Sequence, residues 1–282
     1  MNKGELGEGL TLDKAGAFAY TATVAGKILK VSLADGTTTE VGVLAQFPQG
    51  RQDIYVVGLA FDAAENLDIA VTSFGPAYTS GIYRLAKGGS VAALRTQVAG
   101  FPNGLSFAPD GTCFVSNSFG QIQTVSASGD VSSWFSEPGL TDGDASSSCA
   151  TGFGIGANGI HATDEAVYFT NSDRAQMVKV ARKGDGTAGD SSFVVPSNCA
   201  TFNGADGVAP GPNGSFYVAS NQQNALLKVT SAGVVSVVAS GSLFAFPSSV
   251  AYSAKDSAVY VINAAFGDVK KPGIVKVPVQ NN

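Results

Sequence analysis

The feature of this chain that most restricts its fold is an internal repeat of about 48 residues that occurs six times. Each copy begins with a short motif, in most cases a polar residue followed by glycine and an apolar residue, and continues into an apolar segment. The residues at the equivalent position of the six copies are Glu8, Val57, Asn103, Asn158, Asp206 and Ser248. A period of this length is typical of propeller blades. The chain is therefore expected to consist of six similar structural units.

The apolar segments of each copy indicate short β-strands. Segments such as 27–31 and 226–229 alternate with a period of two, and pairs such as Asp35-Gly36 and Asn213-Gly214 supply hairpin turns. No long stretch shows a helical period. Four short strands per copy predict an all-β fold, a six-bladed β-propeller with four-stranded antiparallel blades around a central channel. Residues 1–282 would form a single domain.

Two other architectures are less compatible with the repeat. A β-sandwich would not repeat its sequence at this interval, and a β-helix repeats at a much shorter one. The sixth copy has only three strands after Phe246, so its outer strand has to come from elsewhere in the chain. We therefore expect the N-terminal segment 1–6 to pair with the last blade and close the ring.

Four of the six equivalent positions carry side chains that core packing does not favour. The innermost strands of a propeller line its channel, so these polar residues should converge on one axis. Burying them is costly unless a partner satisfies them. Two carboxylates balance one divalent cation and amide carbonyls add neutral oxygens, a ligand set that suits Ca²⁺. Each residue-glycine pair alone could be an ordinary turn, but the shared offset from the following strand favours a metal-binding channel.

The same residues resemble those of the SMP-30, gluconolactonase and luciferin-regenerating-enzyme-like propellers, with paraoxonases and diisopropylfluorophosphatase as more distant relatives. The resemblance covers the whole chain at the level of repeats and is specific at four motifs, such as Phe-Pro-Asn-Gly-Leu around Asn103. It implies that Glu8, Asn103, Asn158 and Asp206 bind Ca²⁺ or another divalent cation. It also implies a calcium-dependent hydrolase of lactones or esters, in which Asp206 is both ligand and catalytic base or nucleophile and the metal polarises the carbonyl.

Two departures from the family pattern bear on the substrate. Sugar lactonases of this family carry an arginine shortly before the third-repeat asparagine, where this chain has Phe101-Pro102. A tryptophan commonly follows the first-repeat glutamate, whereas the only tryptophan here is Trp134. The pocket is therefore expected to be more apolar than a sugar site. Its candidate residues are Phe74, Phe101, Phe119 and Phe153, although each alone could be ordinary loop packing.

Two other functions are compatible with the same scaffold. One is a non-catalytic, NHL-like propeller that binds a ligand or protein on one face and uses the metal as a structural plug. The other resembles strictosidine synthases, which rely on a channel glutamate, whereas Asp206 and the oxygen ligands here favour a metal site. His161 is expected to point away from the channel and to be structural, so no Ser-His-Asp triad is predicted.

The three cysteines allow one disulfide and one free thiol. Cys149 and Cys199 precede the innermost strands of neighbouring repeats by similar distances, so a bridge between their loops is predicted, although both could be reduced in a cytosolic protein. A bridge favours a secreted or periplasmic protein with its signal removed over a cytoplasmic one. The long segment 136–155 suggests a lid, and Cys113 is expected to be a small buried residue.

Composition excludes several classes of partner. The net charge of −5, without a large basic cluster, argues against nucleic acid and anionic membrane surfaces. No run of about 18 apolar residues is present, so no membrane span is expected. One histidine and three cysteines are too few for a typical zinc enzyme. The expected partner is a small-molecule substrate, bound by a monomer.

Overall fold

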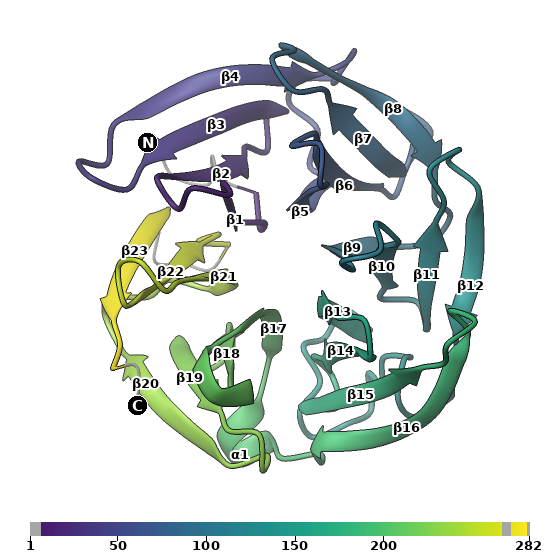
Figure 1. The fold of residues 1–282 in the computed structure, drawn as a ribbon, viewed down its shortest axis with the longest axis vertical. Coiled ribbons are helices and arrows are strands. Elements are labelled where there is room, and N and C mark those ends of the chain that lie inside the picture. The colour runs from purple at the N-terminus through teal and green to yellow at the C-terminus, as the bar shows by residue number, and fades with distance from the viewer. Residues whose placement is uncertain (1–6, 267–271, 281–282) are drawn as a thin grey trace.

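The computed structural model describes residues 7–266 and 272–280, whose regular structure is almost entirely β-strand (Figure 1). Consecutive strands form antiparallel groups that follow the repeats. The first two groups are β1 (Thr11–Leu12), β2 (Phe18–Ala22), β3 (Lys27–Ser32) and β4 (Thr38–Leu44), then β5 (Ile54–Phe61), β6 (Leu67–Ser73), β7 (Gly81–Leu85) and β8 (Val91–Gln97). The next two are β9 (Pro102–Phe107), β10 (Cys113–Asn117), β11 (Gln121–Val125) and β12 (Val131–Phe135), then β13 (Ala157–Ala162), β14 (Ala166–Asn171), β15 (Gln176–Arg182) and β16 (Ala188–Val195). The last two are β17 (Ala205–Pro210), β18 (Phe216–Ser220), β19 (Ala225–Val229) and β20 (Val235–Ser240), then β21 (Pro247–Ser253), β22 (Ala258–Asn263) and β23 (Gly273–Pro278).

The strands of the described residues form five sheets: one of eight strands, three of four strands, and one of three strands. The eight-stranded sheet contains the first two groups, which a short parallel contact joins where Val43 pairs with Val91 and Leu44 with Ala92. The repeat predicts separate blades here, and the difference arises because β4 and β8 lie side by side. Figure 1 shows the sheets arranged around a central axis. The fold is therefore an all-β, propeller-like ring built largely of four-stranded antiparallel sheets.

The hydrophobic core lies between neighbouring sheets. Every residue of β10, β18 and β22 is buried, because these second strands are covered on both faces, whereas outer strands such as β12 are partly exposed. Second strands are therefore mostly apolar, with polar residues at their C-terminal ends. Leu10 and Leu29 of the first group share a buried cluster with Tyr260 and Ile262 of the last, so apolar packing connects the two ends of the ring. The predicted pairing of residues 1–6 lies outside the described residues.

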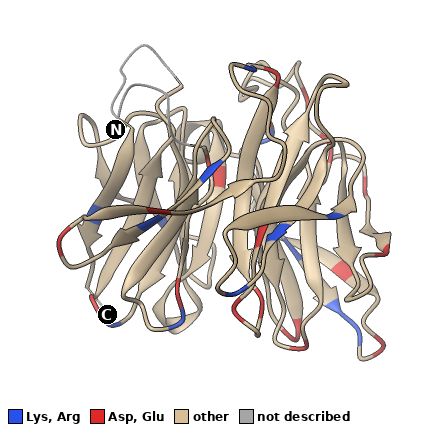
Figure 2. Cartoon of the chain, turned by 90° about the horizontal axis from the view of Figure 1, so that it is seen from above, with Lys and Arg blue, Asp and Glu red and all other residues tan. Residues whose placement is uncertain are grey.

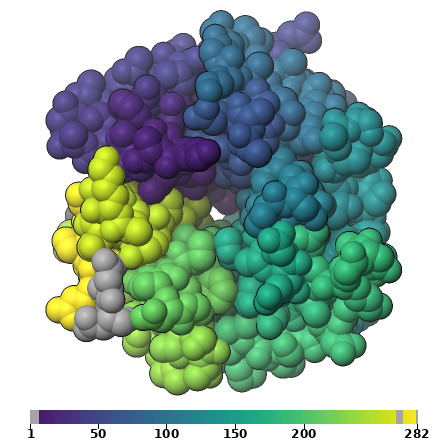
Figure 3. Space-filling model, in the orientation of Figure 1, coloured from purple at the N-terminus to yellow at the C-terminus, as the bar shows by residue number. Residues whose placement is uncertain are grey.

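Helices are short in the described part of the chain. The helix α1 (Cys199–Phe202) is capped by the side chain of Asn198, and η1 (Pro212–Gly214) is a single 3-10 turn. Neither is long and apolar enough to cross a membrane. Many of the charged residues lie in turns (Figure 2), and the face seen in Figure 3 has a narrow opening at its centre.

The predicted disulfide is present. It joins Cys149, in the loop before β13, to Cys199 at the start of α1, with 5.1 Å between the two Cα atoms. Such a bond is compatible with an extracellular or periplasmic protein. Cys113 is buried and has a free thiol, as predicted.

The segment 136–155, which was expected to be a lid, is fastened to the sheets beside it. The buried carboxylate of Asp173 accepts hydrogen bonds from the backbone N–H (2.8 Å) and the hydroxyl (2.7 Å) of Thr151. Arg174 forms an ion pair with Asp142 (3.2 Å). Together with the disulfide, these contacts fix the segment to the strands beside it.

Candidate functional site

The four predicted ligand residues lie together at the axis of the ring. All six equivalent residues of the repeat, called the ring residues below, line one small cavity of about 80 Å³: Glu8, Val57, Asn103, Asn158, Asp206 and Ser248. Asn103, Asn158 and Asp206 are no more than 5% exposed. The structure therefore brings every residue of the predicted metal site to one place, and Val57 leaves one side of that place apolar.

A recurring β-bulge positions the ring residues. In β13, Asn158 and Gly159 together oppose a single residue of β14, Thr170. The same slip of register occurs in β5, β9 and β17. A bulge bends its strand and re-aims a side chain. Because the slip occurs at the same point of four repeats, it places the ring residues at equivalent positions on the axis.

The glycine that follows a ring residue allows close packing of the inner strands. Gly104, Gly159 and Gly207 lie inside β9, β13 and β17 and none has a positive φ, so the interpretation of these pairs as ordinary turns is wrong. A Cβ atom on Gly104 would lie 2.6 Å from the carbonyl oxygen of Asn158, and one on Gly207 would lie 2.7 Å from that of Ser248. Each glycine thus faces the ring residue of the next repeat, where a side chain does not fit.

We expect Gly104→Ala to lower the free energy of unfolding by about 1–3 kcal/mol, the usual cost of overpacking. The added Cβ would also lie 2.8 Å from the Ser116 hydroxyl, so both neighbours would have to move. Urea denaturation measures the effect. Gly184→Ala is the control, because a Cβ there meets no atom within 4 Å. Equal stabilities of the two variants would contradict the close-packing role.

Two serines that the sequence analysis missed orient the asparagines of the site. The Nδ2 atom of Asn103 donates a hydrogen bond to Ser118 Oγ (3.1 Å), and that of Asn158 donates to Ser172 Oγ (2.9 Å). The two hydroxyls donate in turn to backbone carbonyl oxygens of the next repeat, at 2.9 and 2.7 Å. With its amino group held in this way, each asparagine keeps its carbonyl oxygen for a ligand.

Asn221 has the corresponding role in the fifth repeat. Its Nδ2 atom donates to Asp206 Oδ2 at 3.0 Å. Its own Oδ1 atom is buried and has no hydrogen-bond partner in the described residues. A buried acceptor of this kind calls for water or an ion. Asn221 and the two serines each follow directly after a second strand, and this shared offset is the signal that could have identified them in the sequence.

The two carboxylates of the site have raised pKa values. Burial raises the pKa of Glu8 to about 7. Burial, and then the charge of Glu8, raise the pKa of Asp206 well above its ordinary value, while hydrogen bonds from Asn221 and Asn158 oppose the rise. Neither carboxylate has an ion-pair partner in the described residues. Both would ionise more readily beside a cation.

The donor set of the site fits a hard divalent cation. Carboxylate and amide oxygens are the ligands that such ions prefer. The structure contains no group of three or more His, Cys, Asp or Glu side chains suited to a metal, as far as its residues are described. A cation at the axis would therefore need amide oxygens and water in addition to Glu8 and Asp206.

Three of the four predicted pocket phenylalanines form an aromatic cluster. The ring centroids of Phe74 and Phe101 are 5.4 Å apart, those of Phe101 and Phe119 are 6.0 Å apart, and Tyr55 adds a contact with Phe74 at 5.7 Å. None of these rings lines the small cavity, but Phe101 and Phe119 lie in the sequence beside the Asn103 motif and Ser118. Phe153 is 77% exposed and lies outside this cluster.

Comparisons with known proteins support the fold. No protein-family model and no curated protein matches the chain. Among solved structures, it is similar to virginiamycin B lyase from Staphylococcus aureus (15% identity, 94% of each chain covered, TM-score 0.58). It is also similar to the calcium-binding protein regucalcin from Agrobacterium tumefaciens (17% identity, 93% of this chain and 83% of that chain, TM-score 0.65). An auxiliary nutrient binding protein from Bacteroides thetaiotaomicron matches at 11% identity over 90% of this chain and 66% of that chain (TM-score 0.69). These structures are β-propellers, and at such identities they show the fold alone.

Proposed function

We propose that the protein is a six-bladed, single-domain β-propeller that binds a divalent cation, Ca²⁺ by preference, through Glu8, Asn103, Asn158 and Asp206. The observation that supports this proposal best is the convergence of one buried and one partly buried carboxylate and two oriented amides on one axial cavity. Counting the eight-stranded sheet as two blades gives six blades, one for each repeat.

We further propose that the site hydrolyses an ester or lactone. A bound divalent cation would act as a Lewis acid on the substrate carbonyl. Asn221 donates to Oδ2 of Asp206 and so orients this carboxylate, which would accept a proton from attacking water. Ser118 and Ser172 fix the amides of Asn103 and Asn158, so the site needs little reorganisation during the reaction.

The substrate class follows from the aromatic cluster. Phe74 and Phe119 are 54% and 57% exposed, and both contact Phe101 next to the Asn103 motif. Aromatic surface of this kind binds apolar acyl or aryl groups. An apolar ester or lactone is therefore a better candidate than a sugar lactone.

The exposure of these phenylalanines also favours a second candidate function. Exposed apolar side chains gathered on one face are typical of a docking surface, so the cation could be structural in a binding propeller. Assays with lactones and aryl esters separate the two functions. Turnover of any of these substrates by calcium-loaded protein supports the hydrolase. Absence of turnover with the whole panel contradicts it.

Calcium is expected to raise the thermal midpoint of EDTA-treated protein. An ion present at about 100 times its Kd stabilises by roughly 2.7 kcal/mol, or about 5–10 °C for a chain of this size. Because burial raises the pKa of Glu8 from 4.5 to about 7, the metal-free native state binds more protons than the unfolded chain across this range. The stability of metal-free protein should therefore fall as the pH rises from 4.5 to about 7, while the calcium-induced shift grows.

Differential scanning calorimetry at several pH values, with EDTA or Ca²⁺, measures both trends. Glu8→Gln is the matched variant, because it keeps the size of the side chain and removes its charge. It should lose most of the calcium shift and flatten the pH dependence of the metal-free protein. A calcium shift of wild-type size in Glu8→Gln would exclude Glu8 as a ligand.

A further inference from the structure

A second and much larger cavity lies at the opposite ends of the inner strands. It has a volume of about 900 Å³, within the range of small-molecule sites. The residues that follow each ring residue by two positions line both cavities and thus lie between them: Leu10, Leu59, Leu105, Ile160, Val208 and Val250. All six are aliphatic, so the large cavity has an apolar floor that the sequence repeats in every blade.

Five aromatic side chains contribute to the walls of this cavity, beside charged residues at its rim. Tyr20 and Phe61 pack edge to face with their ring centroids 5.0 Å apart, and Phe18, Phe107 and Tyr252 line the cavity as well. Aliphatic floor and aromatic walls together favour a ligand with an apolar body.

The acidic groups at the rim are already engaged. Asp62 forms an ion pair with Arg84 (3.1 Å), and Glu65 forms one with Lys87. The carboxylate of Asp13 accepts two hydrogen bonds from backbone N–H groups, at 2.7 and 2.9 Å. Two of the three carboxylates at the rim thus have a basic counterion, and the third is held by backbone N–H groups.

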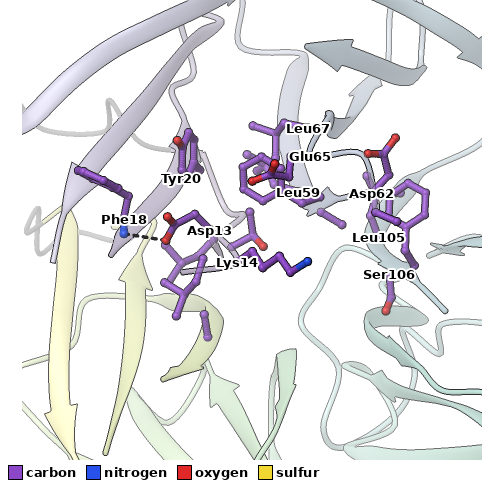
Figure 4. A pocket seen from close by; sticks show the side chains of 18 of the residues that line it. Asp13, Lys14, Phe18, Tyr20, Leu59, Asp62, Glu65, Leu67, Leu105 and Ser106 are labelled. Atoms are coloured by element: carbon purple, nitrogen blue, oxygen red, sulfur yellow. Dashed lines mark hydrogen bonds between the residues drawn. The ribbon is translucent and has the colours of Figure 1, made fainter. Parts of the chain in front are cut away.

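The basic residues that line the cavity differ, because one lysine has no ion pair, hydrogen bond or aromatic contact among the residues described in the structure. Lys30 lies over the ring of Phe18, at 3.7 Å from its centroid. Lys14 has no ion pair or hydrogen bond within the described residues, and Figure 4 shows it extending into the space between Tyr20 and Ser106. Burial lowers the pKa of His161, which also lines the cavity, to about 4, so this side chain is neutral at pH 7.

We propose that this cavity binds a small apolar carboxylate, such as a medium-chain fatty acid. The apolar body lies on the aliphatic floor between the aromatic walls, and the carboxylate pairs with the ammonium group of Lys14. The site is separate from the ring residues and needs neither the cation nor the hydrolase activity proposed above.

Fluorescence quenching of full-length Phe107→Trp by 10-bromodecanoate tests this site, at concentrations below micelle formation. Phe107 lines the cavity, whereas the native Trp134 lies on the outer strand β12 and donates to the backbone carbonyl of Gly186, between β15 and β16 (2.8 Å). Saturable quenching is expected in Phe107→Trp and not in the wild-type protein. Absence of saturable quenching, or equal quenching in both proteins, would overturn the proposal. Thermal melting confirms that the variant is folded.

Charge reversal tests the role of the lysine. Lys14→Glu in the Phe107→Trp protein should weaken binding on the order of tenfold, because an attractive charge becomes a repulsive one near the carboxylate. Lys255→Glu is the matched control, since Lys255 is exposed on the equivalent turn of the last repeat and does not line the cavity. Equal affinities of the two variants would overturn the pairing with Lys14. So would stronger displacement of the probe by decyltrimethylammonium than by decanoate. Added EDTA or Asp206→Asn should leave the affinity unchanged, which separates this site from the axial one.

Discussion

Asp206→Asn is expected to abolish hydrolysis and to stabilise the metal-free protein at the same time. Loss of a general base costs roughly 10²–10⁴-fold in rate, and the loss of a charged ligand weakens cation binding further. The metal-free native state, however, no longer holds two carboxylates together at the axis, and the charge of Glu8 is one cause of the raised pKa of Asp206. The amide oxygen can still accept the hydrogen bond from Asn221. Activity and metal-free stability should therefore change in opposite directions.

Initial rates with an aryl ester and urea denaturation in EDTA at pH 8 measure the two effects. Asp173→Asn is a suitable control, because Asp173 is also a buried aspartate but anchors the segment around Thr151. That variant should lose stability and keep its response to calcium. An Asp206→Asn protein that retains turnover, or the full calcium shift, would remove Asp206 from the mechanism.

The repeat makes the positions of the ring residues predictable. Each ring residue precedes a buried second strand by nearly the same number of residues, and the recurring bulge keeps this offset from blade to blade. Alignment of the repeats therefore identifies Glu8 and Asp206 although they are almost 200 residues apart. The glycines mark the same positions in the sequence, because close approach of the inner strands allows no side chain at Gly104 or Gly159.

Side chains at the ends of the second strands were harder to predict. Asn117 and Asn171 end their strands, and their amide groups make them candidates for contact with the site. Their Nδ2 atoms instead donate to backbone carbonyls of the preceding loops, at 2.7 and 2.9 Å. The next residues, Ser118 and Ser172, contact the site instead. The direction in which a side chain points at the end of a strand depends on the following turn, which sequence alternation does not define.

Tertiary packing also determined features that no local pattern contains. The parallel contact of β4 with β8 covers only two residue pairs and depends on how two outer strands lie in space. The aromatic cluster could be predicted in part, because Phe74, Phe101 and Phe119 lie in loops at one end of the inner strands. Phe153 lies in a similar loop and is exposed, although other residues of its segment contact the strands beside the cluster, such as Asp142, which pairs with Phe119.

Asp68→Asn is expected to destabilise the protein by about 3–5 kcal/mol, the usual cost of breaking a buried ion pair. Asp68 is fully buried in β6 and binds Arg84 through both oxygens, at 2.7 and 3.0 Å. It also pairs with Arg95, whose guanidinium donates to the Ser126 carbonyl of the next repeat (2.7 Å). Neutralising Asp68 would leave two guanidinium groups short of a counterion between two blades. Thermal melting should show a loss on the order of 10 °C.

Two further variants distinguish the net contribution of this ion cluster to stability from the cost of leaving its charges unpaired. Glu65→Gln removes a carboxylate from an ion pair on the surface of the same repeat, where both side chains are about half exposed or more, and should change stability by less than about 1 kcal/mol. Replacing Asp68 by Leu together with Arg84 and Arg95 by Met removes the buried carboxylate and both partly buried guanidinium groups. This variant should recover much of the loss, because no guanidinium group is left without its counterion. A triple variant as unstable as Asp68→Asn would mean that the ion cluster itself holds the second and third repeats together. An Asp68→Asn protein as stable as the wild type would mean that Asp62, which also contacts Arg84, and solvent suffice for the arginines.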